Sequence, residues 1–98
     1  MEVQYKNSKI QEICTNPKIA RKEYGATMAG KIRQRIGQLS AADSVDILIQ
    51  YHIGRCHRLI GDRAGQCAMD LEQPYRLIFI QGNSEIQIVE VQEIIDYH

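Results

Sequence analysis

The sequence lacks the features that mark membrane-spanning, secreted and multidomain proteins. Every apolar run is shorter than the roughly 20 residues that a membrane-spanning helix needs. The first residues, MEVQYKNSK, carry no apolar core of the kind found in a secretory signal. No repeat, linker or low-complexity segment interrupts the chain. These absences predict a cytoplasmic protein without a membrane partner, built as a single domain over residues 1–98.

Cysteine is scarce and follows no metal-binding or redox spacing. The three cysteines, Cys14, Cys56 and Cys67, include no CxxC pair, and an odd, scattered set predicts free thiols in a reducing compartment. Cys56, His57 and Cys67 would supply only three ligands of a metal site. We therefore expect buried thiols that act as small hydrophobic side chains, and neither a metal nor another cofactor.

The chain also has no excess of positive or negative charge. Lys and Arg number 12, Asp and Glu number 12, and the formal net charge is zero, with a positive first half and a negative second half. This balance argues against capture of nucleic acid by bulk charge, but it leaves room for a local basic patch. The sequence has neither a phosphate-binding glycine loop nor a nucleophilic serine motif.

The first half of the chain predicts a strand followed by helices. Residues 1–5 alternate apolar and polar side chains, as a half-buried strand does. Asn7 or Ser8 can cap a short helix, and Asn16-Pro17 begins a longer one that we expect to end near Gln38. The charged side chains of that helix, including Arg35, are predicted to form a solvated face. Its apolar stripe consists of Ala20, Tyr24, Met28, Ile32 and Leu39, with Ile36 alongside.

The second half predicts a short helix and then a series of strands. Ser40-Ala-Ala-Asp43 has the spacing of a capping box, and the helix after it is expected to end near Tyr51–His52, where Gly54 can adopt a left-handed conformation. The predicted strands are Arg55–Ile60, Gln66–Leu71, Tyr75–Gln81 and Ile86–Val91. Helices followed by an antiparallel meander predict an α+β fold, with the helices packed on one face of a twisted sheet.

The polar residues of the second half suit cleavage of an RNA phosphodiester. His57 and His98 can exchange protons near neutral pH, Asp96 can act as a base or orient a histidine, and Tyr97 can donate a hydrogen bond or stack on a base. Guanidinium groups offer fixed donors to phosphate. The arginines in this region are Arg55, Arg58, Arg63 and Arg76.

Each of these residues also has a structural explanation. His57 can be a histidine at the edge of the core, and Arg63 can stiffen its turn beside Asp62. Arg76 can pair with Asp70 or Glu90 across the sheet. Asp96-Tyr97-His98 can be a frayed tail, because chain ends are often poorly ordered.

Three motifs together resemble a known family. They are Gly54-x-x-His57-x-Leu59-x-Gly61-Asp62-Arg63-x-Gly65, Tyr75-Arg76-Leu77-Ile78-Phe79, and the final Asp96-Tyr97-His98. The combination resembles the HigB-type (killer protein) toxins of the RelE/ParE superfamily, over about residues 35–98 by motif and over the whole chain by the order of its elements.

The resemblance implies the toxin half of a type II toxin–antitoxin pair. Such a toxin is a ribosome-dependent endoribonuclease that cuts mRNA in the decoding site, contacts 16S rRNA, and is neutralised by a helix-turn-helix antitoxin through which it reaches operator DNA. The resemblance associates His57, Asp96, Tyr97 and His98 with catalysis and Arg76 with phosphate contact. Arg55, Arg58 and Arg63 are our further candidates for RNA contact.

Two positions depart from the family pattern. Where members often have Pro and Lys, this chain has Arg58 and Ile60; if both lie on one strand, alternation places them on the same face, and Arg58 would replace the missing cation. Two other functions stay open: a ParE-like inhibitor of DNA gyrase that is not an enzyme, and a weakly active member that serves as a corepressor with its antitoxin.

Overall fold

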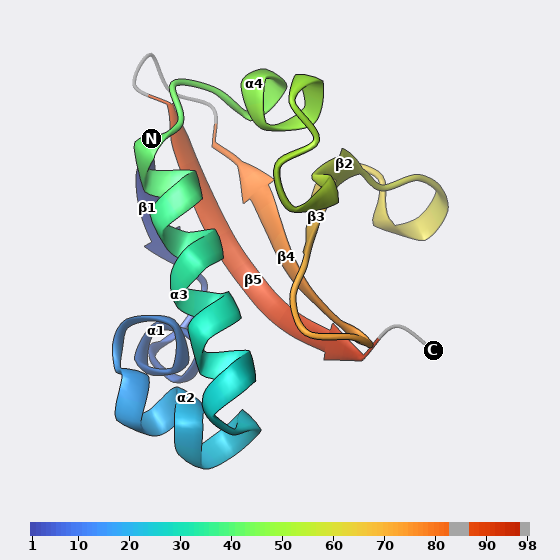
Figure 1. The fold of residues 1–98 in the computed structure, drawn as a ribbon. Coiled ribbons are helices and arrows are strands. Elements are labelled where there is room, and N and C mark those ends of the chain that lie inside the picture. Colours follow the sequence, from blue (N-terminus) through green and yellow to red (C-terminus); the bar gives the residue numbers. More distant parts are fainter. Residues whose placement is uncertain (83–86, 97–98) are drawn as a thin grey trace.

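The computed structural model describes residues 1–82 and 87–96. It contains a five-stranded sheet with helices along one of its faces (Figure 1). The α-helices are α1 (Ser8–Thr15), α2 (Pro17–Tyr24), α3 (Ala26–Ala41) and α4 (Val45–Gln50), and the short 3-10 helices are η1 (Ile53–Arg55) and η2 (Gly61–Arg63). The strands are β1 (Glu2–Tyr5), β2 (His57–Arg58), β3 (Gln66–Asp70), β4 (Tyr75–Gln81) and β5 (Ile88–Asp96).

The strand order in the sheet is β1-β5-β4-β3-β2. Strands β2 to β5 form an antiparallel meander, and β1 joins the other side of β5 in parallel. The expected α+β fold is therefore confirmed. No helix among the described residues combines the length and the apolar character that spanning a membrane would require.

The helices begin where the sequence predicts, but the long one is divided. The side chain of Asn7 accepts a hydrogen bond from the backbone N–H of Ile10, and Asn16 accepts one from Lys18 just before α2 begins at Pro17. The expected single helix from Pro17 to Gln38 is wrong, because Gly25 adopts a φ of +89° that no helix accommodates. The chain turns there, and α3 packs back along α2.

The cap of α4 also differs from the prediction. The predicted capping box at Ser40 lies within the end of α3 and the residues after it, and it is Ser44 that accepts a hydrogen bond from the backbone N–H of Ile47. Gly54 is left-handed as expected, with a φ of +59°. Two non-glycine residues beside it, His52 and Arg55, are left-handed too.

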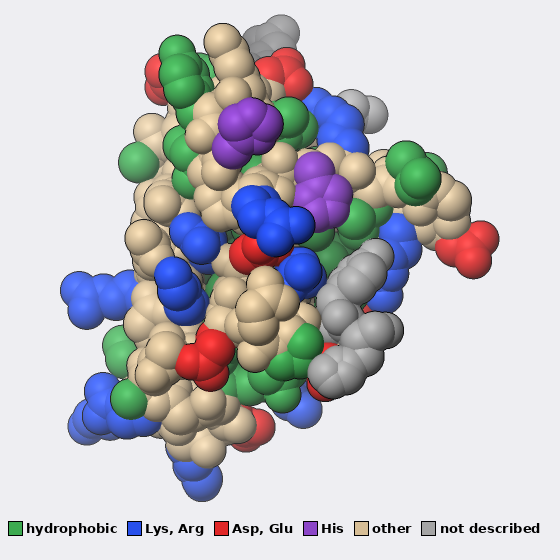
Figure 2. Space-filling model, turned by 45° about the vertical axis from the view of Figure 1, so that its right-hand side comes forward, with side chains coloured by type: hydrophobic (Ala, Val, Ile, Leu, Met, Phe, Trp, Pro, Cys, Tyr) green, Lys and Arg blue, Asp and Glu red, His purple; other side chains and the backbone are tan. Residues whose placement is uncertain are grey.

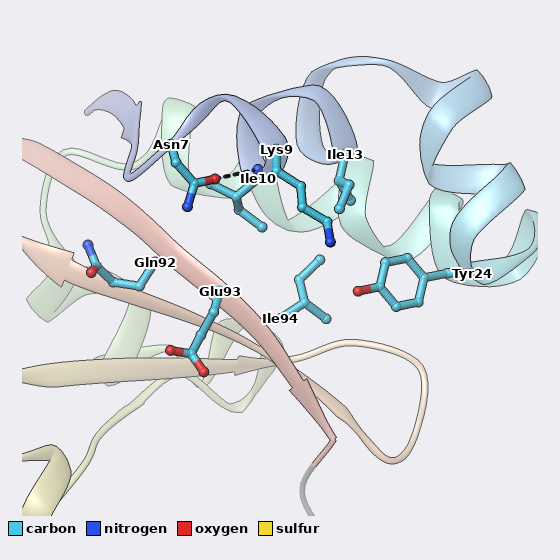
Figure 3. Close-up of a pocket in the computed structure, with 8 residues that line it drawn as sticks. All are labelled: Asn7, Lys9, Ile10, Ile13, Tyr24, Gln92, Glu93 and Ile94. Carbon is cyan, nitrogen blue, oxygen red and sulfur yellow. Dashed lines mark hydrogen bonds between the residues drawn. The ribbon is translucent and has the colours of Figure 1, made fainter.

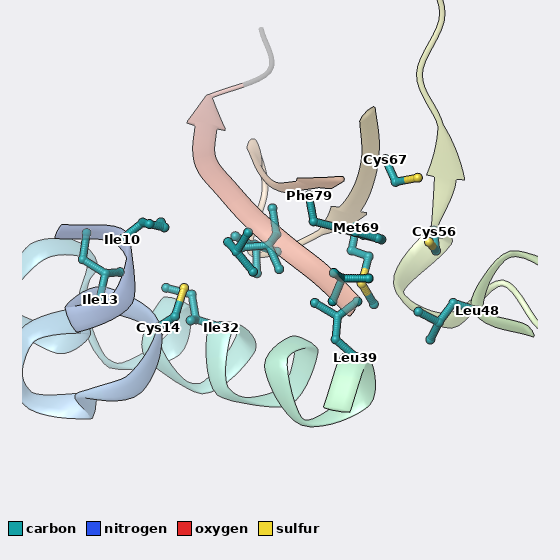
Figure 4. Packing of buried hydrophobic residues seen from close by; sticks show 14 of the residues in the cluster. Ile10, Ile13, Cys14, Ile32, Leu39, Leu48, Cys56, Cys67, Met69 and Phe79 are labelled. Carbon is teal, nitrogen blue, oxygen red and sulfur yellow. The ribbon is translucent and has the colours of Figure 1, made fainter. Parts of the chain in front are cut away.

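The core lies between the helices and one face of the sheet (Figure 4). Alternate strand residues enter it, including Met69, Leu77 and Phe79, and they meet Ile32 and Leu39 of α3. The three cysteines are buried free thiols. Burial raises the pKa of Cys14 and of Cys56 to about 12 and also raises that of Cys67.

The last strand is longer than predicted and the second is shorter. We expected Ile86–Val91, whereas β5 runs from Ile88 to Asp96, so Asp96 belongs to the sheet and not to a tail. Strand β2 contains only His57 and Arg58, and Ile60 lies outside it with 88% of its surface exposed. The C-terminal half of β5 therefore brings a predicted functional residue to the end of the sheet.

Candidate active site

His57 lies on β2 and is exposed to solvent. Its Nδ1 is 2.8 Å from the backbone carbonyl oxygen of Arg55. A carbonyl oxygen can only accept a hydrogen bond, so this contact places a proton on Nδ1. In the neutral ring the lone pair then remains on Nε2, which is the nitrogen that can take a proton from a substrate. The alternative of a core-edge histidine does not fit this exposure.

Arg55 lies at the end of η1, directly before the buried Cys56. Its φ of +53° is unusual for a residue with a side chain. The side chain is 73% exposed, and its Nε is 3.4 Å from Oδ2 of Asp70. The same residue thus faces solvent with its guanidinium and contacts His57 with its backbone.

Arg76 lies opposite Asp70 in the pairing of β4 with β3. Its Nε is 2.9 Å from Oδ1 of Asp70, and both side chains are mostly buried, with 15% and 11% of their surfaces exposed. The contact is an ion pair in which the N–H is not aimed at the oxygen. Of the two partners weighed from sequence, Asp70 is the one found, because Glu90 lies opposite Ile80.

The strand register places these groups on one face of the sheet. His57 lies opposite Ala68, Ala68 lies opposite Ile78, and Asp70 lies opposite Arg76. Since side chains alternate along a strand, all of them project from the face that the core does not use. Figure 2 shows histidine side chains beside a group of Lys and Arg side chains gathered round an acidic one. An exposed imidazole and a guanidinium thus project from the same face of the sheet.

Arg63 is on the same side but has partners of its own. Its guanidinium donates to Oε1 of Gln66 at 2.9 Å and pairs with Glu93 at 3.5 Å. These contacts tie the η2 turn to β3 and β5. They agree with the structural explanation that Arg63 stiffens its turn.

Arg58 projects away from His57. It lies opposite the buried Cys67, and its NH2 nitrogen is 2.9 Å from Oδ1 of Asp46 in α4. The condition that Arg58 and Ile60 lie on one strand is not met, because β2 ends at Arg58. The structure therefore does not bring Arg58 together with the other candidates.

The three C-terminal candidates are placed only in part. Asp96 is exposed and lies opposite Tyr75, one position beyond the pair of Arg76 with Ile95. It is thus at the same end of the sheet as Arg76, but alternation directs the two side chains to opposite faces. Tyr97 and His98 lie outside the described residues, so their roles stay predictions.

Arg35 is a residue that sequence reasoning assigned wrongly. We expected it on a solvated face, but it is buried with 8% of its surface exposed. Its Nε donates to the backbone oxygen of Asp70 at 2.6 Å, and its NH1 donates to Gln38 at 3.0 Å. The signal was present, because position 35 continues the stripe of Met28, Ile32 and Leu39 at helical spacing.

A concave region lies away from these candidate residues (Figure 3). It lies between α1, the end of α2 and the last part of β5, where the side chains of Lys9, Tyr24 and Ile94 point toward one another. None of the predicted site residues lines it. Among residues 1–82 and 87–96, no group of three His, Cys, Asp or Glu side chains is placed to hold a metal ion.

Comparison with known proteins identifies a shared fold. No family model matches the sequence, and no curated protein matches it. Among solved structures, a YoeB/ParE toxin from Agrobacterium tumefaciens is similar with a TM-score of 0.66 and 20% sequence identity, over 100% of this chain and 99% of that one. The chain therefore shares its fold with this toxin over its whole length.

Proposed function

We propose that this protein is the toxin component of a type II toxin–antitoxin system and cleaves mRNA as a ribosome-dependent endoribonuclease. One observation carries the proposal. The exposed His57, whose Nδ1 contacts the backbone oxygen of Arg55, lies on the open side of the sheet together with the guanidiniums of Arg55 and Arg76. The fold shared with a YoeB/ParE toxin supports it.

The reaction needs three contributions from the protein. The ribose 2′-OH loses its proton to a base and attacks the adjacent phosphorus, the P–O5′ bond breaks, and an acid gives a proton to the departing O5′. The products are a 2′,3′-cyclic phosphate and a 5′-hydroxyl. His57 is suited to the proton transfer through Nε2, while Arg55 and Arg76 stabilise the charge that builds up on phosphate. His98, Asp96 and Tyr97 are candidates for the remaining proton transfer and for orientation.

The partners follow from this function. The substrate is mRNA in the decoding site, so the protein contacts 16S rRNA in the cytoplasm. A helix-turn-helix antitoxin neutralises the toxin and links it to operator DNA. Because the net charge is zero, contact with RNA rests on the local arginine group and not on a field over the whole surface.

Primer extension on mRNA from cells that briefly express the protein tests the proposal. We expect cuts at fixed codon positions in translated frames with the wild type, and a loss of about 10²- to 10⁴-fold with His57→Ala, the usual contribution of a general acid or base. Deletion of His98 tests the second histidine. Asp46→Asn is the control, because this exposed carboxylate is not among the residues to which we assign proton transfer or phosphate contact. Equal cutting by the wild type and the His57→Ala variant would remove His57 from the mechanism.

One observation favours a second function, because a solved structure similar to this chain is a YoeB/ParE toxin. A ParE-like protein would inhibit DNA gyrase by binding, without a catalytic histidine. Growth arrest without mRNA cuts, together with inhibited supercoiling by purified gyrase, would support it. If the protein causes neither mRNA cuts nor growth arrest, the result would favour a corepressor that acts with its antitoxin.

A further inference from the structure

Three arginines from three elements contact Asp70, two of them at its carboxylate and one at its backbone oxygen. Arg76 of β4 pairs with its Oδ1 at 2.9 Å, and Arg55 of η1 pairs with its Oδ2 at 3.4 Å. Arg35 of α3 donates to its backbone oxygen at 2.6 Å. Asp70 itself is buried, with 8% of its surface exposed. A buried carboxylate is costly unless it is paired, so Asp70 depends on the arginines that it holds.

Arg35 of α3 joins the backbone of Asp70 to the segment that precedes His57. Its guanidinium is buried, and the backbone of Gly54 packs directly on it: a Cβ on Gly54 would lie 2.8 Å from Nε of Arg35. Arg35 also donates to Gln38 within α3. The end of β3, the helix α3 and the segment before His57 are therefore joined at one place.

The backbone of that segment takes an unusual course. His52, Gly54 and Arg55 all have positive φ values, of 54°, 59° and 53°. Non-glycine residues keep such a conformation only when surrounding contacts determine it. For Arg55 these contacts are the ion pair with Asp70 and the hydrogen bond from its backbone N–H to His52 at 3.1 Å. Its carbonyl oxygen is the one that meets Nδ1 of His57.

We propose that Asp70 is a positioning residue of the site. It acts in two directions: it holds the guanidinium of Arg76 directly, and through Arg55 it sets the carbonyl that orients the His57 ring and keeps the proton on Nδ1. The phosphate contact and the proton transfer are thus adjusted by one buried carboxylate that touches no substrate. This role rests on the function proposed above, but the orientation of His57 can be tested without it.

Asp70→Asn tests the proposal, because it removes the charge and keeps the shape. The readout is the pair of ¹⁵N chemical shifts of the His57 ring, measured by NMR on the purified protein at a pH where the ring is neutral. We expect the wild type to hold the proton on Nδ1, and Asp70→Asn to show the mixed population of a histidine in an unstructured peptide. Cleavage of mRNA should fall about tenfold to a hundredfold, as when a reacting group is misplaced by about 1 Å.

The matched control is Asp46→Asn, which makes the same chemical change at the ion pair with Arg58. It should leave the His57 ring unchanged. A folded Asp70→Asn protein with the wild-type tautomer would overturn the proposal, whatever its activity. A lost tautomer in a protein that cleaves no mRNA even as wild type would uphold the role of Asp70 and reject the ribonuclease.

A second variant covers failure to fold. If the amide spectrum of Asp70→Asn shows an unfolded chain, Arg55→Gln breaks the same link from the exposed side. It should produce the same mixed tautomer of His57, and an unchanged tautomer would overturn the proposal.

Discussion

On the helix-covered face of the sheet, Leu77, Phe79 and Val91 are fully buried and uncharged, whereas on the opposite face Asp70 forms ion pairs with Arg55 and Arg76. The first face gains free energy by removing apolar surface from water. The second face carries charged side chains, and burying such a side chain costs free energy unless it is paired. Neighbouring positions on one strand therefore serve different ends, and substitutions on the two faces should separate stability from activity.

The largest expected effect is on the helix-covered face. Phe79→Ala should lower the free energy of unfolding by about 3–5 kcal/mol, because it removes a fully buried ring and leaves a cavity. Urea denaturation followed by circular dichroism measures this change.

The control for Phe79 is Ile60→Ala, since Ile60 is 88% exposed. It should change the free energy of unfolding by less than about 0.5 kcal/mol. Similar losses in both variants would contradict the contrast between a packed core and an exposed turn.

The next effect appears at high pH. Burial raises the pKa of Cys14 and of Cys56 to about 12, so folding favours the neutral thiols. This stabilisation is fully present below the unfolded value near 9 and is lost as the pH rises from there toward 12. We expect each thiol to remove about 1 kcal/mol per pH unit above 9.

Urea titrations between pH 7 and pH 10.5 check this slope. The double variant Cys14→Ala, Cys56→Ala should be less stable at pH 7 but should lose less stability above pH 9. An equal slope in both proteins would show that other groups, such as Tyr5 or Tyr24 with their raised pKa values, cause the loss.

A smaller effect probes the junction between the two faces. Gly54→Ala forces a side chain into a left-handed backbone and against Nε of Arg35, 2.8 Å away. We expect a loss of about 2–3 kcal/mol, of which about 1–2 kcal/mol is the backbone term. Gly61→Ala is the control, because Gly61 has a φ of +67° and nothing within 4 Å of its Cβ position. In thermal unfolding, Gly61→Ala should lose only the free energy that the left-handed backbone costs. Equal losses of stability in the two variants would mean that the Arg35 side chain moves aside without cost.

The smallest effect concerns the exposed ion pair of Arg58 with Asp46. Its side chains are 53% and 85% exposed, so solvent screens the attraction. Arg58→Ala should change the free energy of unfolding by less than about 1 kcal/mol. A larger loss in urea denaturation would show that β2 depends on this contact.

The fold could be predicted because its signals are local. The alternation in β1, the apolar run of β4, the caps at Asn7 and Asn16 and the order of elements suffice to predict an α+β meander. The break at Gly25 was missed, because glycine tolerates a helix interior and also a sharp turn, and only the packing of α3 on α2 decides between them.

The sequence indicates the residue types of the candidate site, but it does not indicate which of these residues contact one another. His57 and Arg76 follow from the motifs, whereas the contact of Arg35 depends on the backbone oxygen of Asp70 that lies beside α3. No spacing in the sequence encodes that contact. The alternation argument for Arg58 failed since it assumed a longer strand than the two residues found.

The position of β5 has a consequence for the time at which the protein becomes complete. This strand pairs with β1 on one side and β4 on the other, although it follows every other element in the chain. The pairing of Glu2 with Ile88 joins the two ends of the sequence and closes a long loop, which slows folding. During synthesis β1 cannot join the sheet until β5, which lies between β1 and β4, has been made. A chain that ends before β5 would therefore leave the edge of β4 without its partner strand, and we expect proteases to degrade it.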